Sequence, residues 1–167
     1  SDGDGFKDGA EIVAGTDPTN PNSKPSTPII LGTETASLIG GDLTDPENDG
    51  DPENDLNYNA VFASSEEPGF AGGEFAFNVF DNLLEGGNGK WCCGNGAFPY
   101  WVQATFEEPI VLTHFTVSSA NDTPDRDPRV WEIQGSNDGT TFETIFRQDD
   151  PAVQIWTARH QVIKFEE

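Results

Sequence analysis

The stretch that decides the fold is VWEIQGSNDGTTFETIFR, residues 130–147. Two runs that alternate apolar and polar residues, Val130–Gly135 and Phe142–Arg147, flank the tetrapeptide SNDG. Asn, Asp and Gly tolerate the positive φ of tight hairpin turns, and a period of two gathers apolar side chains on one face of a strand. The stretch therefore predicts a β-hairpin that turns Trp131 and Ile133 toward a core.

Short runs of the same kind extend outward from this hairpin. The further strand candidates are Tyr58–Ala63, Trp101–Phe106, Ile110–Ser118, Val153–Trp156 and Gln161–Phe165. A short apolar stretch at Ile29–Leu31 precedes a candidate edge strand at Ala36–Ile39, and Glu74–Phe80 is predicted as one helical turn. With 18 Gly and 12 Pro, the chain carries many turns, which disfavours long helices. Many short strands joined by turns predict an all-β chain folded as a jelly-roll β-sandwich.

Composition divides the 167 residues into two parts. Residues 1–28 are acidic at first and then rich in Pro, Thr, Asn and Ser, which indicates a separate segment followed by an extended linker. Residues 29–167 carry the strand pattern and form the predicted sandwich domain. Within them, Asp42–Asp55 is a second acidic stretch and is expected to be a solvated loop.

The chain is strongly acidic, with 30 Asp and Glu against 8 Lys and Arg and a net charge of −22. This charge repels nucleic acid and anionic membranes, so neither is expected as a partner. No apolar run approaches the ~20 residues that cross a bilayer, so membrane insertion is not expected. The acidity serves either solubility, as in a salty habitat, or the binding of divalent cations.

The N-terminal sequence SDGDGFKDGAE has the spacing of an EF-hand-type loop. Such a loop converges alternate oxygen ligands on a hard dication, with Gly at position 6 for the sharp turn and Glu at position 12. Gly5 takes that Gly position, and the first ligand position falls before Ser1. The predicted calcium ligands are Asp2, Asp4, the carbonyl of Phe6, Asp8 and Glu11. The alternative is a disordered acidic tail.

This acidic segment, together with GTDP at residues 15–18, resembles thrombospondin type 3 repeats and the related calcium repeats of bacterial extracellular proteins. The resemblance implies that Asp17 helps to bind a neighbouring calcium ion. It also implies a secreted, extracellular or cell-surface protein.

Three further motifs follow one another in the larger part of the chain. They are VFDN at residues 79–82 leading to KW at 90–91, FPYWVQATFEEPIVLTHFTV at 98–117, and WEIQGSNDGTTFETI at 131–145. Together they resemble the discoidin, or coagulation factor 5/8 type C, family, which includes the galactose-binding modules of carbohydrate-binding module family 32. The resemblance implies a galactose-binding-like sandwich over roughly residues 74–165.

The same resemblance implies a second calcium site. The family binds metal through the motif Asp and nearby loop carbonyls, which correspond here to the side chain of Asp81 and the carbonyl of Asn78. The loop from Asp81 to Trp91 is longer than the family's usual loop. Because the chain ends at Glu167, before the family's last strands, an open sandwich would expose unpaired edges, so we expect either that a partner strand completes it or that the chain packs differently.

Sugar-binding members of the family place polar ligands in the loop before the hairpin, which is Ser119–Arg129 in this sequence. Arg offers a fixed fork of donors, and Asn and Asp offer acceptors, which suits neighbouring sugar hydroxyls. The predicted ligand-binding residues are Asn121, Asp122, Arg126, Arg129, Lys90 and Phe98. The alternative for the two arginines is local salt bridges with Asp125 and Asp127. Aromatic platforms for a sugar ring could come from Trp91, Phe98, Phe70 or Trp156.

The two cysteines, Cys92 and Cys93, are adjacent. Neighbouring Cα atoms lie ~3.8 Å apart, below the usual disulfide span, so a bond between them would be strained. A vicinal disulfide, two free thiols and an intermolecular link stay open. A zinc site is not expected, because His114 and His160 are the chain's two histidines.

The sequence shows no nucleophile elbow, no zinc helix and no Ser/His/Asp constellation, so it predicts a binding module and no enzyme. The leading interpretation is a calcium-stabilised carbohydrate-binding module of a secreted or cell-surface protein, with calcium as cofactor and a polysaccharide or glycan as partner. The alternative is a structural or adhesive module that assembles through a sandwich edge with other copies or domains of its parent protein.

Overall fold

The computed structural model describes residues 16–20, 28–39, 43–44, 58–66, 73–84, 89–92, 98–148 and 154–166, with the backbone alone for residues 58–62. The strands are β1 (Ile29–Gly32), β2 (Tyr58–Ala63), β3 (Val102–Phe106), β4 (His114–Ser118), β5 (Trp131–Gly135), β6 (Glu143–Gln148) and β7 (Val162–Glu166). Helical structure in these ranges consists of short 3-10 turns, at η1 (Thr35–Ser37), η3 (Ala76–Val79) and η4 (Pro124–Arg126). The prediction of an all-β chain is confirmed.

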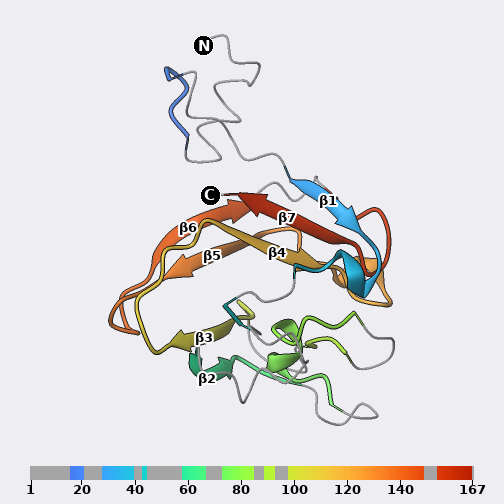
Figure 1. The fold of residues 1–167 in the computed structure, drawn as a ribbon, viewed down its shortest axis with the longest axis horizontal. Helices are drawn as coiled ribbons and strands as arrows, with labels where there is room; N and C mark the ends of the chain where they lie inside the picture. Colours follow the sequence, from blue (N-terminus) through green and yellow to red (C-terminus); the bar gives the residue numbers. More distant parts are fainter. Residues whose placement is uncertain are drawn as a thin grey trace.

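All the strand pairs are antiparallel. Strand β7 lies at the centre of a three-stranded sheet in the order β1-β7-β4, while β5 pairs with β6 and β2 pairs with β3 (Figure 1). No helix in the described ranges is long and apolar enough to cross a membrane.

Four aromatic rings form the centre of the core. Phe115 on β4 stacks on Phe165, its partner in register on β7, with ring centroids 5.1 Å apart. From the β5–β6 hairpin, Phe146 approaches Phe115 to 5.2 Å and Trp131 approaches Phe165 to 5.3 Å. Phe165 is fully buried, and burying such large apolar surfaces is the main source of the domain's stability. The period-two pattern of the hairpin thus places its apolar face against the β4–β7 pair.

The SNDG turn is closed by the side chain of Asp138. Its Oδ1 accepts hydrogen bonds from the backbone N–H groups of Thr140, at 2.8 Å, and Thr141, at 2.7 Å. These bonds hold the pKa of Asp138 well below its ordinary value, so the carboxylate stays ionised. Gly139 has φ +68°, a conformation that glycine adopts without a steric penalty.

The predicted strand positions agree with the structure with a few exceptions. Tyr58–Ala63 has the predicted bounds, whereas the strand predicted at Ile110–Ser118 begins only at His114. The edge strand predicted at Ala36–Ile39 is wrong, because the backbone there turns through η1, with the Ser37 N–H donating to the Glu34 carbonyl at 2.7 Å. The apolar stretch before it forms β1.

Two other predicted elements change in kind or length. The described part of the predicted strand Val153–Trp156 is not a strand, because the Gln154 side chain donates to the Trp156 carbonyl at 3.1 Å and so turns back on the local backbone. The helical turn predicted at Glu74–Phe80 is confirmed as the shorter η3.

Candidate functional site

The loop Ser119–Arg129 joins β4 to β5 and is fixed at its base. The backbone N–H of the buried Ser119 donates to the Gln161 carbonyl at 3.1 Å, and its hydroxyl donates to the Ala158 carbonyl at 2.9 Å. The same hydroxyl accepts the Gln161 N–H at 3.0 Å. The start of the loop is therefore bound to the segment that leads into β7.

A buried ion pair holds the far end of the same loop. Arg159 Nη1 donates to Asp127 Oδ1 at 2.9 Å, and Nη2 makes a second, short contact to Oδ2. The Asp127 side chain is 4% exposed. Arg159 also donates to the backbone carbonyls of Ala120, at 3.3 Å, and Asp122, at 3.0 Å. Arg159 thus ties both halves of the loop to one point, and the bond to Asp127 raises the pKa of its guanidinium.

Lys90 fixes the opposite side of the loop. Its Nζ lies 2.9 Å from Asp122 Oδ1, 2.9 Å from Asn121 Oδ1 and 3.3 Å from Glu74 Oε1. An ammonium group has three N–H donors, and here each of them has an oxygen acceptor. The Lys90 side chain is 12% exposed and that of Glu74 is 7% exposed. The hydrogen bond from Lys90 is the main reason that the pKa of Asp122 lies below its ordinary value.

Arg126 lies on the exposed side of this cluster. Its Nη2 donates to Asp122 Oδ2 at 3.0 Å and to Thr123 Oγ1 at 2.9 Å, while Nη1 lies 3.8 Å from the sulfur of Cys92. About half of the Arg126 side chain stays exposed. The structure therefore brings together four of the predicted ligand-binding residues, Lys90, Asn121, Asp122 and Arg126, and many of their polar atoms already bond to one another.

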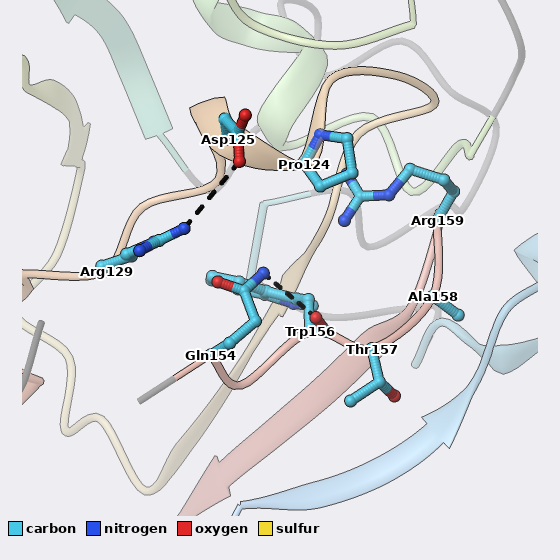
Figure 2. A pocket seen from close by; sticks show the side chains of 8 residues that line it. All are labelled: Pro124, Asp125, Arg129, Gln154, Trp156, Thr157, Ala158 and Arg159. Atoms are coloured by element: carbon cyan, nitrogen blue, oxygen red, sulfur yellow. Dashed lines mark hydrogen bonds and ion pairs between the residues drawn. The ribbon is translucent and has the colours of Figure 1, made fainter. Parts of the chain in front are cut away.

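Arg129 lies apart from that cluster, beside an open pocket of about 700 Å³ (Figure 2). Its Nη2 is 4.0 Å from Asp125 Oδ1, an ion pair between two exposed side chains. The local salt bridges considered for this loop thus hold for Arg129 with Asp125. Arg126 pairs instead with Asp122, and Asp127 pairs with Arg159.

The pocket also has lining residues that sequence reasoning missed. Gln154, Thr157 and Arg159 line the pocket from the segment before β7, and the Gln154 side chain lies across the pocket from the loop (Figure 2). No motif spacing relates this segment to the loop, which lies about 30 residues earlier. The ion pair of Arg159 could not be read from neighbouring residues, because Asp127 meets it only in the folded chain.

The four aromatic platform candidates differ in availability. Phe98 is 83% exposed and packs against Tyr100 with ring centroids 4.4 Å apart. Trp91 is half-buried, and its indole N–H donates to the Ser65 carbonyl at 2.8 Å. Trp156 is 2% exposed and belongs to the core, so its ring faces are not open for stacking. Phe70 lies outside the described residues.

The implied metal site at Asp81 has oxygen donors of the type that calcium prefers. The Asp81 side chain is buried, and its Oδ1 accepts the Leu83 N–H at 3.0 Å. The Asn78 amide nitrogen donates to the carbonyls of Lys90, at 2.8 Å, and Gly73, at 3.3 Å, so these bonds fix the position of the residue whose backbone carbonyl is the second implied ligand. A buried carboxylate is a ligand of the kind that a hard dication takes.

The N-terminal calcium ligands cannot be placed in the same way. The described residues do not include five of the predicted ligands, Asp2, Asp4, Phe6, Asp8 and Glu11. Cys93 also lies outside them. Asp17 is described, and its carboxylate accepts hydrogen bonds from the N–H of Thr19, at 2.9 Å, and from the Thr19 hydroxyl, at 2.7 Å. Within the described ranges, His, Cys, Asp and Glu form no group of three or more that could hold a metal ion.

Comparison with known proteins gives two family matches. The F5/8 type C domain family matches residues 60–167, and the bacterial TSP3 repeat family matches residues 1–21. A curated protein of Arabidopsis thaliana, peptide-N(4)-(N-acetyl-beta-glucosaminyl)asparagine amidase, is 32% identical over 111 residues. This alignment covers 65% of the chain but 14% of the relative, so the chain spans a small part of that protein's length. No solved structure matches the chain.

Proposed function

This chain belongs to the F5/8 type C domain family, and we propose that it is a non-catalytic carbohydrate-binding module stabilised by calcium. The Arabidopsis relative supports a glycan as partner, since it is named as an amidase of N-acetylglucosaminyl asparagine. The corresponding region is a small part of that enzyme, which is compatible with an accessory binding module.

The observation that carries the proposal is the rigid attachment of the loop Ser119–Arg129. Ion pairs fix it on both sides, one between Lys90 and Asp122 and one between Arg159 and the buried Asp127. Its outer side chains stay exposed, with Arg126 at 54% and Arg129 at 48%. A loop that is already ordered loses little conformational entropy when it binds, so weak hydrogen bonds to sugar hydroxyls can give measurable affinity.

The state of the loop carboxylates supports binding without catalysis. Glycosidases need a carboxylic acid whose pKa is raised so that it can protonate a leaving group. Around this loop the carboxylates of Glu74, Asp122 and Asp127 each lie beside a cation, and the pKa of Asp122 is lowered. The lowered pKa keeps the Asp122 carboxylate ionised, so this group serves as an acceptor and not as a proton donor.

Calcium is proposed at two places. The match to the TSP3 repeat supports binding by Asp2, Asp4, Phe6, Asp8 and Glu11, with Asp17 contributing to a neighbouring ion. The buried carboxylate of Asp81 and the carbonyl of Asn78 are the proposed ligands beside η3. There calcium would neutralise the buried charge of Asp81 and fix the end of η3.

We also propose that the parent protein is secreted or displayed at the cell surface, because both families are typical of extracellular proteins. Fractionation of the producing cells and their medium tests this localisation.

Affinity electrophoresis in gels that contain soluble polysaccharides tests this function. The chain should be retarded by at least one polysaccharide in calcium and less in EDTA, and it should release no reducing ends from that polysaccharide. The double variant R126A/R129A should lose the retardation, whereas R147A, which also removes an exposed arginine, should keep it. Absence of retardation by any polysaccharide refutes glycan binding, and release of reducing ends refutes the non-catalytic assignment. Sedimentation at high concentration in calcium separates this function from the adhesive alternative, which requires self-association.

A further inference from the structure

The two sides of the loop Ser119–Arg129 differ in their capacity to bind a ligand. On the side of Lys90, the three donors of the ammonium group and both oxygens of Asp122 already have partners within the protein. A sugar hydroxyl arriving there would have to displace existing charged hydrogen bonds. On the other side lies the open pocket, where Arg129 is placed (Figure 2).

Arg129 is the donor that this pocket offers. Among the described residues, its one polar contact is the ion pair with Asp125 at 4.0 Å, which is longer than a hydrogen bond. A guanidinium has five N–H donors in a fixed fork, so Arg129 can bind two neighbouring acceptor oxygens at once. The three other described arginines, Arg126, Arg147 and Arg159, make hydrogen bonds of 3.0 Å or less.

Acceptors lie next to this donor. The Asp125 side chain is 96% exposed and extends toward Arg129, and Gln154 lies across the pocket from them (Figure 2). The Gln154 amide nitrogen is used by the Trp156 carbonyl, so its oxygen is the atom left for a ligand. The ring of Pro124 supplies apolar surface beside these polar groups.

The charges around the pocket cancel. Arg129 is matched by Asp125, and Arg159 is matched by Asp127. A donor fork beside a carboxylate suits a ligand that both gives and accepts hydrogen bonds, as the adjacent hydroxyls of a sugar do. An anionic sugar would meet the Asp125 carboxylate and a chain of net charge −22. The volume of about 700 Å³ lies in the range of known small-ligand pockets.

We propose that this pocket is the sugar-binding subsite of the module, and that it takes an uncharged pyranose through adjacent hydroxyls held by Arg129 and Asp125. This inference rests on the proposed carbohydrate-binding function and assigns its position and its class of ligand. The cluster around Lys90 then serves to hold the loop in place.

Single variants of the full chain test the position. We would measure retardation in gels of increasing concentration of a neutral β-galactan, a neutral β-glucan and the acidic polygalacturonate. R129A and D125N should weaken binding to a neutral polysaccharide by about tenfold or more, because each loses hydrogen bonds between charged groups and ligand. The control R147A should bind as the wild type does. Both Asp125 and Arg129 are exposed, so unchanged thermal unfolding would show that these variants are folded.

The outcomes separate the two proposals. Retardation that R126A reduces more than R129A overturns the pocket and leaves the carbohydrate-binding function standing. Stronger retardation by polygalacturonate than by either neutral polysaccharide overturns the uncharged class of ligand. If none of the three retards the wild-type chain, the pocket proposal fails, and a broader glycan screen then decides the carbohydrate-binding function.

Discussion

The carboxylate of Asp127 and the guanidinium of Arg159 form a two-point ion pair that joins the loop before β5 to the segment before β7. The pair is buried on the Asp127 side, and Arg159 extends it by donating to two backbone carbonyls of the same loop. The geometry of the loop Ser119–Arg129 therefore depends on an arginine that lies outside it.

Replacing either partner of this pair should destabilise the fold. R159A leaves the Asp127 carboxylate buried without its cation, which costs about 3–5 kcal/mol in the free energy of unfolding. The double variant D127A/R159A should cost less than the sum of the two single variants, because it leaves no unpaired charge. Urea unfolding of the four proteins measures this coupling. If the loss of stability in the double variant equals the sum of the losses in the two single variants, the two residues do not stabilise the fold as a pair.

Lys90 should be more important for stability than exposed basic residues. K90A leaves Glu74, whose side chain is 7% exposed, without its cation, and we expect a loss of about 2–3 kcal/mol. R147A removes an exposed ion pair with Glu132 and should cost less than about 1 kcal/mol. Chemical unfolding of K90A and R147A measures the two losses of stability. Equal losses in the two variants would contradict the role given to Lys90.

Asp122 should make the stability of the domain depend on acid pH. Because the hydrogen bond from Lys90 lowers its pKa in the folded state below the ordinary 3.8, its ionised form stabilises the fold above about pH 4. This stabilisation is lost as the pH falls from there through the lowered folded pKa. The variant D122N lacks this stabilisation, so the difference in melting temperature between wild type and D122N should shrink as the pH falls from 5 to 2. Parallel curves over that range would contradict the assignment.

Calcium binding should depend on the N-terminal carboxylates. D4N removes one proposed ligand, so the calcium affinity of that site should fall by about tenfold or more. E108Q removes a carboxylate of an exposed residue outside both proposed sites and serves as the matched control. Isothermal titration calorimetry of the full chain measures the calcium affinity of both variants. An affinity that D4N leaves unchanged would place calcium elsewhere.

Several features of this protein could be predicted because their signals are local. The SNDG turn and its flanking alternation are contained within residues 130–147, and the structure has a hairpin there. The motifs at residues 79–145 carried a family resemblance that the match over residues 60–167 confirms. The acidic spacing at the N-terminus likewise agrees with the TSP3 match over residues 1–21.

Other features depend on contacts between distant parts of the chain. Local sequence placed an edge strand at Ala36–Ile39, where hydrogen bonds of the polar backbone instead form η1. The three donors of Lys90 bond to Glu74 on one segment and to Asn121 and Asp122 on another, and both segments are distant from Lys90 in the sequence. The role of Arg159 depends in the same way on Asp127. No spacing rule connects such residues before the strands have paired.

Binding of the labelled chain to a glycan array in the presence of calcium tests the central claim most directly. We predict selective binding to a limited set of glycans, which R147A retains and R126A/R129A loses. Binding to no glycan, or equal binding by R126A/R129A, would contradict a carbohydrate-binding module whose site is the loop Ser119–Arg129.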